Sequence, residues 1–135
     1  MSKNLDLVRS IYAAQERGDW SIGEWAHPDI EFVRVDGPEV GTWTGRERVE
    51  EAVRDRVSAW EDFRRHAEEF RELDDERVLV VSRRSGRARA TGLDIEQLDA
   101  GARAAAVVHI CDGRVTRILA YWDRDRALAD LGLKE

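Results

Sequence analysis

Residues 103–122 read RAAAVVHICDGRVTRILAYW, and this stretch decides how the rest of the chain must fold. Two runs rich in β-branched and apolar residues are separated only by Asp112 and Gly113. Glycine adopts a positive φ at little cost, and an aspartate before it favours a tight turn, so the stretch predicts a β-hairpin. We expect this hairpin to form the centre of a curved sheet around which the other elements wrap.

The loop of this hairpin determines which side chains share a face. A loop of residues 111–113, with Gly113 as a left-handed bulge, makes one face almost wholly apolar and places Ala106 opposite Ile118. The members of that face are then Ala104, Ala106, Val108, Ile110, Thr116, Ile118, Ala120 and Trp122. A two-residue loop would instead turn His109 toward the same side as Ile118. We favour the three-residue loop, which directs His109 away from the apolar face.

The length and composition of the chain predict one folded domain over residues 1–135. Hydrophobic residues make up 42% of the chain and charged residues 37%, which is enough apolar content for one core. The net charge of -6 argues against a nucleic-acid partner, since such partners are held by neutralising their phosphates. No run is long and apolar enough to span a bilayer, so no membrane partner is expected.

The scarcity of cysteine and histidine limits the chemistry further. Cys111 is the only cysteine, so no intrachain disulfide is possible and a reducing cytoplasm is the expected location. The histidines at positions 27, 66 and 109 lack the spacing of a metal site. We therefore expect neither a metal nor a cofactor, and His109 is the natural acid–base candidate only if it faces the pocket.

The order of predicted elements indicates the fold class. Helices are expected over residues 4–17, from Ser21 to about Trp25, from a capping box at Thr44 to Glu47 as far as Trp60, and over 124–131. Strands are expected over residues 30–35, 40–43, 63–73 and 78–90, and residues 97–101 are expected to cross back to the hairpin. Residues 63–73 are rich in helix formers, and only their context favours a strand. The pattern predicts an α+β fold: a cone-shaped, strongly bent antiparallel sheet with helices packed on its concave face.

Several short motifs follow one another along nearly the whole chain. They are residues 8–12 with Gly18-Asp19, residues 27–32, Gly41 with residues 45–47, residues 111–115, residues 120–124, Ala127-Leu128 and residues 131–133. In these segments the chain resembles the SnoaL-like polyketide cyclase and ketosteroid isomerase superfamily, which shares the fold of nuclear transport factor 2. The resemblance implies an α+β cone with an apolar pocket, and often a dimer through the outer face of the sheet.

The catalytic groups that this resemblance implies are mostly replaced. The position of the isomerases' proton-abstracting carboxylate falls on Arg34, and that of their protonated aspartic acid falls on Ala106. The acid–base aspartate of the cyclases falls on Ala120. The first-helix tyrosine falls near Tyr12, and Trp122 resembles an aromatic residue of the isomerases' pocket wall. The resemblance therefore supports the pocket walls more than the proton-transfer chemistry.

Arg34 and Tyr12 are the candidate catalytic residues, as electrophilic groups that hold an oxyanion. Strand alternation turns Arg34 inward with Phe32; the alternative is an arginine paired with an acidic side chain at the mouth of the cone. Tyr12 has the alternative of simple packing on the sheet. The expected pocket residues are Trp25, Phe32, Trp43, Trp60, Phe63, Val108, Ile118, Ala120 and Trp122.

These residues predict a pocket for a small hydrophobic molecule, either polycyclic or carrying a carbonyl or anionic oxygen. An isomerase, cyclase or lyase activity stays open, since the usual carboxylates are missing. The alternative is a non-catalytic module whose cone is filled by its own side chains. A homodimer is expected through the outer sheet face, because Val107, Leu119 and Tyr121 on that face need cover.

Overall fold

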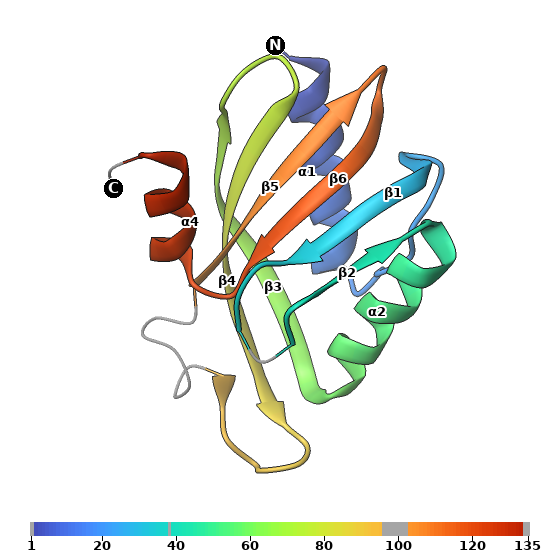
Figure 1. Cartoon of the computed structure of the whole chain (residues 1–135). Helices are drawn as coiled ribbons and strands as arrows, with labels where there is room; N and C mark the ends of the chain where they lie inside the picture. Colours follow the sequence, from blue (N-terminus) through green and yellow to red (C-terminus); the bar gives the residue numbers. More distant parts are fainter. Residues whose placement is uncertain (1, 38, 96–102, 134–135) are drawn as a thin grey trace.

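The computed structural model describes residues 2–37, 39–95 and 103–133. Its elements are α1 (Lys3–Glu16), β1 (Ala26–Arg34), β2 (Gly41–Thr44), α2 (Arg46–Ser58), β3 (Trp60–Glu72), β4 (Arg77–Ala88), β5 (Arg103–Cys111), β6 (Arg114–Tyr121) and α4 (Arg124–Leu131). The described strands form one sheet in the order β2-β1-β6-β5-β4-β3 (Figure 1). The predicted α+β fold is confirmed. The sheet is mixed, because β1 runs parallel to β6 while the other neighbours are antiparallel.

The turn of the central hairpin differs from the three-residue loop that we favoured. Cys111 pairs with Arg114, so only Asp112 and Gly113 form the turn, with φ of 52° and 78°. Two positive φ values are typical of the tight turn whose twist matches that of the flanking strands, and Asp-Gly is a preferred sequence for it. The prediction of a three-residue loop is therefore wrong at the turn itself.

A β-bulge at Thr116 nevertheless restores the apolar face. His109 pairs with residue 117 and residue 110 pairs with residue 115, so Thr116 has no partner and the register shifts by one. For residues 104–110 of β5 and 118–120 of β6, the even-numbered side chains then share one face, as expected, and His109 lies on the other. On the turn side of the bulge the parity changes, and Val115 lines the cavity in the place expected for Thr116. Ala106 lies opposite Ala120 and not Ile118.

The sheet carries an apolar cluster on each face. On the concave face, Val8 of α1 and Val49 of α2 pack against sheet residues that include Val80 and Val108. On the outer face, α4 covers Val107, which is 1% exposed. Helices α1 and α2 thus occupy the concave face as predicted, while α4 lies on the opposite one (Figure 1).

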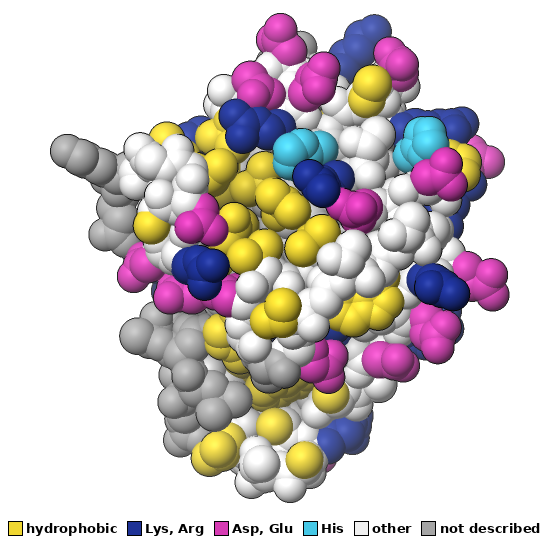
Figure 2. All heavy atoms as spheres, in the orientation of Figure 1, with side chains coloured by type: hydrophobic (Ala, Val, Ile, Leu, Met, Phe, Trp, Pro, Cys, Tyr) yellow, Lys and Arg dark blue, Asp and Glu magenta, His cyan; other side chains and the backbone are white. Residues whose placement is uncertain are grey.

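Part of the outer face stays open beside α4. Figure 2 shows hydrophobic side chains on this face, and Leu73, Leu119 and Leu133 are among its partly buried members. Tyr121, which we expected to need cover from a second copy, is buried, and its hydroxyl lies 3.1 Å from a carboxylate oxygen of Asp130. The homodimer stays a prediction. None of the described helices combines the length and apolar character needed to cross a bilayer.

Two local predictions fail for reasons of hydrogen bonding. Residues 19–25 form a loop where a short helix was expected, because Asp19 accepts hydrogen bonds from the backbone and side chain of Ser21 and stabilises a turn. Helix α2 begins after Gly45 with no side-chain cap, so the capping box is wrong. Residues 63–73 lie almost wholly within β3, which confirms the strand, whereas the predicted crossing at 97–101 falls outside the described residues.

Candidate functional site

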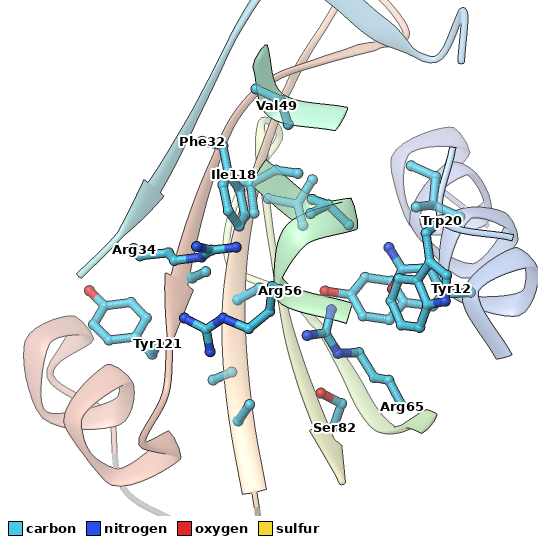
Figure 3. Close-up of a pocket in the computed structure, with 18 of the residues that line it drawn as sticks. Tyr12, Trp20, Phe32, Arg34, Val49, Arg56, Arg65, Ser82, Ile118 and Tyr121 are labelled. Carbon is cyan, nitrogen blue, oxygen red and sulfur yellow. The ribbon is translucent and has the colours of Figure 1, made fainter. Parts of the chain in front are cut away.

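The concave face of the sheet and the helices α1 and α2 enclose a cavity of about 110 Å³ (Figure 3). Its apolar walls include Val8, Val49, Val53, Val57 and Val115. An apolar cavity of about 150 Å³ is large enough to hold benzene, so this space is close to the size of one small ring. The cone is therefore not completely filled by its own side chains.

Most of the residues expected to form the pocket lie around this cavity. Those that line it are Tyr12, Trp25, Phe32, Arg34, Phe63, Val108, Ile118, Ala120 and Trp122. Trp43 lies outside the lining, on the edge strand β2, where its ring packs against Phe32 with centroids 6.0 Å apart. Trp60 is also outside the lining; it is buried against Ile95 and Trp122 at the start of β3.

The cavity lining is strongly basic. Four arginines from four elements reach it: Arg34 of β1, Arg56 of α2, Arg65 of β3 and Arg84 of β4. Asp36 is the only acidic side chain in the described lining, and its carboxylate accepts hydrogen bonds from the backbone amides of Trp122 at 2.6 Å and Asp123 at 3.3 Å. The site therefore has an excess of positive charge within apolar walls.

Arg34 already has partners on both of its terminal nitrogens. Nη1 donates to Glu39 Oε2 at 3.0 Å, and Nη2 donates to the carbonyl oxygen of Ala52 at 3.0 Å. The guanidinium also lies 4.8 Å from the ring centre of Trp43 and 5.3 Å from that of Phe32. Burial lowers the pKa of Arg34, and Glu39 partly offsets this. This geometry matches the ion-paired alternative, while the catalytic role of Arg34 stays a prediction.

Two further guanidinium groups surround Trp122. Arg84 stacks on the Trp122 ring at 4.1 Å and donates from Nη2 to the carbonyl oxygen of the same residue at 2.9 Å. Arg56 lies 5.2 Å from the centre of that ring. Burial, with a smaller contribution from Arg34, lowers the pKa of Arg56 to about 10. These contacts orient the indole of Trp122 and fix one end of the cavity.

Arg65 lies at the other end, beside Tyr12. Its guanidinium is 5.6 Å from the ring centre of Trp20 and 5.8 Å from that of Phe63. Figure 3 shows the Tyr12 hydroxyl and the Arg65 guanidinium pointing toward one another. Burial lowers the pKa of Arg65 and raises that of Tyr12, and the attraction between the two groups partly offsets both shifts. Gln15 also reaches this end of the cavity from α1.

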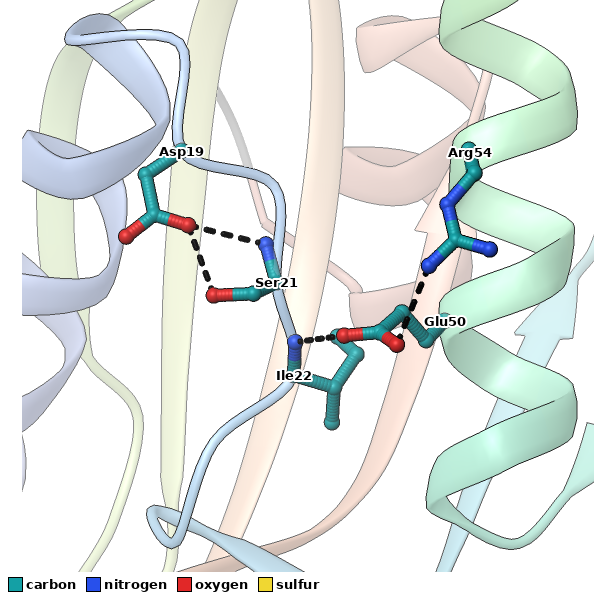
Figure 4. A network of polar contacts seen from close by, with 5 residues as sticks. All are labelled: Asp19, Ser21, Ile22, Glu50 and Arg54. Atoms are coloured by element: carbon teal, nitrogen blue, oxygen red, sulfur yellow. Dashed lines mark hydrogen bonds and ion pairs between the residues drawn. The ribbon is translucent and has the colours of Figure 1, made fainter.

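The loop of residues 19–25 closes one wall of the cavity, to which it contributes Trp20, Ile22 and Trp25. The backbone amide of Ile22 donates to Glu50 Oε1 of α2 at 2.9 Å (Figure 4). The other Glu50 oxygen lies 3.1 Å from Arg54. Glu50 therefore ties the wall to α2 through a single backbone hydrogen bond.

The histidines and the cysteine lie outside the cavity lining. His109 is on the outer face opposite Arg117, and burial together with the charges of Arg117 and Arg77 lowers its pKa. His66 is exposed and ion-paired with Glu16. Cys111 is exposed, and the carboxylate of its neighbour at position 112 raises the pKa of the thiol. Within the described residues, no cluster of histidine, cysteine or acidic side chains is arranged to hold a metal ion.

Comparison with known proteins supports the fold. No family model matches the chain, and no curated protein is similar to it in sequence. An NTF2-like protein of unknown function from Burkholderia pseudomallei superposes with a TM-score of 0.74 at 23% identity, covering 96% of this chain and 97% of that one. The chain has the nuclear transport factor 2-like fold.

Two other structures with the nuclear transport factor 2-like arrangement carry ligands. TerC, co-crystallised with polyporic acid, has a TM-score of 0.70 at 24% identity and covers 96% of this chain and 98% of its own. A Catenulispora acidiphila protein with a ketosteroid isomerase-like fold, in complex with trimethylamine, has a TM-score of 0.66 at 16% identity, covering 95% and 93%. At these identities the likeness establishes the fold alone. This fold is the one that the sequence resemblance predicted.

Sequence reasoning missed several polar residues of the site: Gln15, Arg56, Arg65, Ser82 and Arg84. The alternation of β3 carried a signal for Arg65, because this arginine shares a parity with Phe63 and Ala67, whereas residues 64, 66 and 68 lie on the outward side. Arg84 belongs to a run of arginines on β4 with Arg83 and Arg87, yet it is buried while its neighbour Arg83 is exposed.

Proposed function

We propose that the protein binds a small aromatic molecule that carries an anionic oxygen. The observation that carries this proposal is the combination of apolar walls with four arginines and, among the described lining residues, one carboxylate that is already hydrogen-bonded. Aromatic and aliphatic walls suit a ring, and guanidinium groups pair with carboxylate or enolate oxygens through charge-assisted hydrogen bonds. A cationic ligand would meet net repulsion in the same space.

The size of the cavity favours a single ring over the polycyclic ligand considered from the sequence. A volume of about 110 Å³ is closer to that of one ring than to that of two fused rings. The proposed ligand class is therefore a one-ring aromatic acid or enolate.

The similar structures are compatible with an anionic ligand, but they do not by themselves favour it over a cationic one. TerC was co-crystallised with an acid and the Catenulispora acidiphila protein was complexed with an amine, so one fold accommodates ligands of different charge. In the present chain, the arginines and not the fold favour the acid.

Catalysis by proton abstraction has little support in the lining. Such a step requires a base near the substrate. Asp36, the only acidic residue of the described lining, is already bonded to two backbone amides, and none of the histidines lines the cavity. Tyr12 keeps a role in this proposal as a hydrogen-bond donor to a ligand oxygen. We therefore propose ligand binding as the function, with isomerase, cyclase or lyase activity as the second candidate.

The test is a comparison of isosteric ligands that differ in charge. Benzoate, benzamide and benzylamine are titrated against the protein, with tryptophan fluorescence and thermal unfolding as readouts. Benzoate should quench fluorescence and raise the unfolding temperature more than benzamide, and benzylamine should have the weakest effect. Equal effects of all three ligands, or no effect of any, would contradict the proposal.

A further inference from the structure

The α1–β3 end of the cavity contains two buried polar atoms without hydrogen bonds. Arg65 Nε and Gln15 Oε1 both lack a partner among the described residues. Buried polar atoms in folded proteins are bonded in the great majority of cases, because an orphaned donor or acceptor keeps its desolvation cost. Two such atoms lining one cavity mark a place where a ligand with polar atoms of its own would be stabilised.

The environment of Arg65 leaves its hydrogen-bonding edge available. Trp20 and Phe63 contact the guanidinium through their rings, and stacking of this kind occupies the faces of the group and not its in-plane N–H donors. Among the described residues, the groups that interact electrostatically with Arg65 are Tyr12, Arg34 and Arg56, and none of them is a carboxylate. Within the part of the chain that the structure describes, the positive charge of this half-buried arginine therefore has no carboxylate to balance it.

Two of the other three cavity arginines already have hydrogen-bond partners, and the third, Arg56, has the carboxylate of Glu39 among the charges that act on it. Arg34 is bonded to the carboxylate of Glu39 and to a backbone carbonyl. Arg84 is bonded to the carbonyl of Trp122 and stacked on its ring. Arg65 is thus better placed than either to accept a new anionic partner.

Two residues of α1 complete this end of the cavity. The Tyr12 hydroxyl faces Arg65 (Figure 3) and acts as a donor at neutral pH, since burial raises its pKa. Gln15 follows three residues later, on the same face of the helix, and turning its amide over presents the Nε2–H donors to a carboxylate. Guanidinium, hydroxyl and amide groups therefore converge from β3 and α1.

We propose that Arg65, Tyr12 and Gln15 form a carboxylate-binding subsite that holds a one-ring aromatic acid, with the ring directed toward the apolar wall at Val108 and Ile118. This inference rests on the proposed function and adds which of the cavity arginines recognises the acid.

The test measures the affinities of benzoate and benzamide by calorimetry in wild-type protein and in Arg65→Gln. The variant should bind benzoate about tenfold more weakly or worse, because a hydrogen bond to a charged group is lost, and should bind benzamide with nearly unchanged affinity. Arg64→Gln is the matched control, since it removes the same charge from an exposed neighbour on β3. This control should keep the wild-type preference for benzoate.

The outcomes separate the two proposals. Wild-type protein that fails to prefer benzoate overturns the proposed function. A wild-type preference that survives in Arg65→Gln, or that disappears in Arg56→Gln instead, overturns only the subsite. If Arg65→Gln does not fold, the assigned Arg65 Nε–Hε signal of wild-type protein serves as the readout: it should shift with benzoate and stay in place with benzamide, and an unchanged signal at saturating benzoate would overturn the subsite.

Discussion

Replacing Ala106 by leucine should fill the cavity from the middle of β5. Ala106 lines the cavity opposite Ala120, and the substitution adds three carbon atoms. At about 0.8 kcal/mol for each buried CH₂ group, the largest gain is about 2.4 kcal/mol. An empty cavity of 110 Å³ costs a similar amount, about 2.6 kcal/mol at about 24 cal/mol per Å³. Because the arginines keep part of the space polar and packing strain opposes the gain, we expect the free energy of unfolding to rise by about 1 kcal/mol.

The same substitution should abolish the binding of benzoate, since the leucine occupies the space of the ring. Urea and thermal unfolding measure the stability, and calorimetry measures the binding. Ala127→Leu is the control: Ala127 is a fully buried residue of α4, away from the cavity lining, so leucine there should cost about 1–3 kcal/mol and leave benzoate binding intact. The reasoning is refuted if Ala106→Leu destabilises the protein like the control and still binds benzoate.

Three other substitutions test separate parts of the structure. Glu50→Ala removes the acceptor of the Ile22 amide, and the loss of about 1 kcal/mol should speed benzoate dissociation about fivefold in stopped-flow fluorescence, while the exposed Glu51→Ala should have no effect. Arg34→Met should lower the free energy of unfolding, measured in urea, by about 1–2 kcal/mol and keep the preference for benzoate. Loss of that preference would indicate that Arg34, and not Arg65, binds the anion. His109 has a lowered pKa, so its neutral form stabilises the fold above its ordinary pKa of 6.5, and stability should fall as the pH drops below that value. His109→Gln should flatten this dependence in urea unfolding measured between pH 5 and 8.

The hairpin shows why sequence predicts faces better than registers. The alternation of apolar residues correctly predicted which side chains of β5, and of β6 beyond the bulge, face the concave side, because several apolar side chains are buried together when that face is covered. Before the bulge it was wrong, since Val115 faces the cavity and Thr116 does not. The turn obeyed a different preference, that of Asp112 and Gly113 for a tight two-residue geometry. A bulge at Thr116 satisfies both the turn preference and the apolar alternation, and nothing in the local composition indicated this bulge.

The helix boundaries were predicted where a side chain made the cap that its type favours. Asp123 accepts a hydrogen bond from the amide of Asp125, and Gly132 ends α4 in the left-handed region with φ of 70°. Thr44 and Glu47 had the right spacing for a capping box, yet the N-cap of α2 is Gly45, which has no side chain to make the cap. Capping depends on the path of the chain into the helix, which the sequence pattern does not specify.

The candidate site was predicted in its apolar part and missed in its polar part. Phe32, Val108 and Ile118 follow from strand alternation once the sheet is recognised. Arg65 belongs to a segment whose composition favours helix. Because the strand itself was uncertain from sequence, the side of the sheet that Arg65 faces could not be assigned. Its lack of an acidic partner depends on which elements surround it, and that information exists only in the folded chain.

A crystal structure of the protein with benzoate tests the central claim most directly. We expect the ring inside the cavity, in contact with Val108 and Ile118, and a carboxylate oxygen within hydrogen-bonding distance of Arg65 Nε. Benzoate bound at saturation elsewhere on the molecule, with the cavity holding only solvent, would contradict the claim that this cavity is a site for aromatic acids.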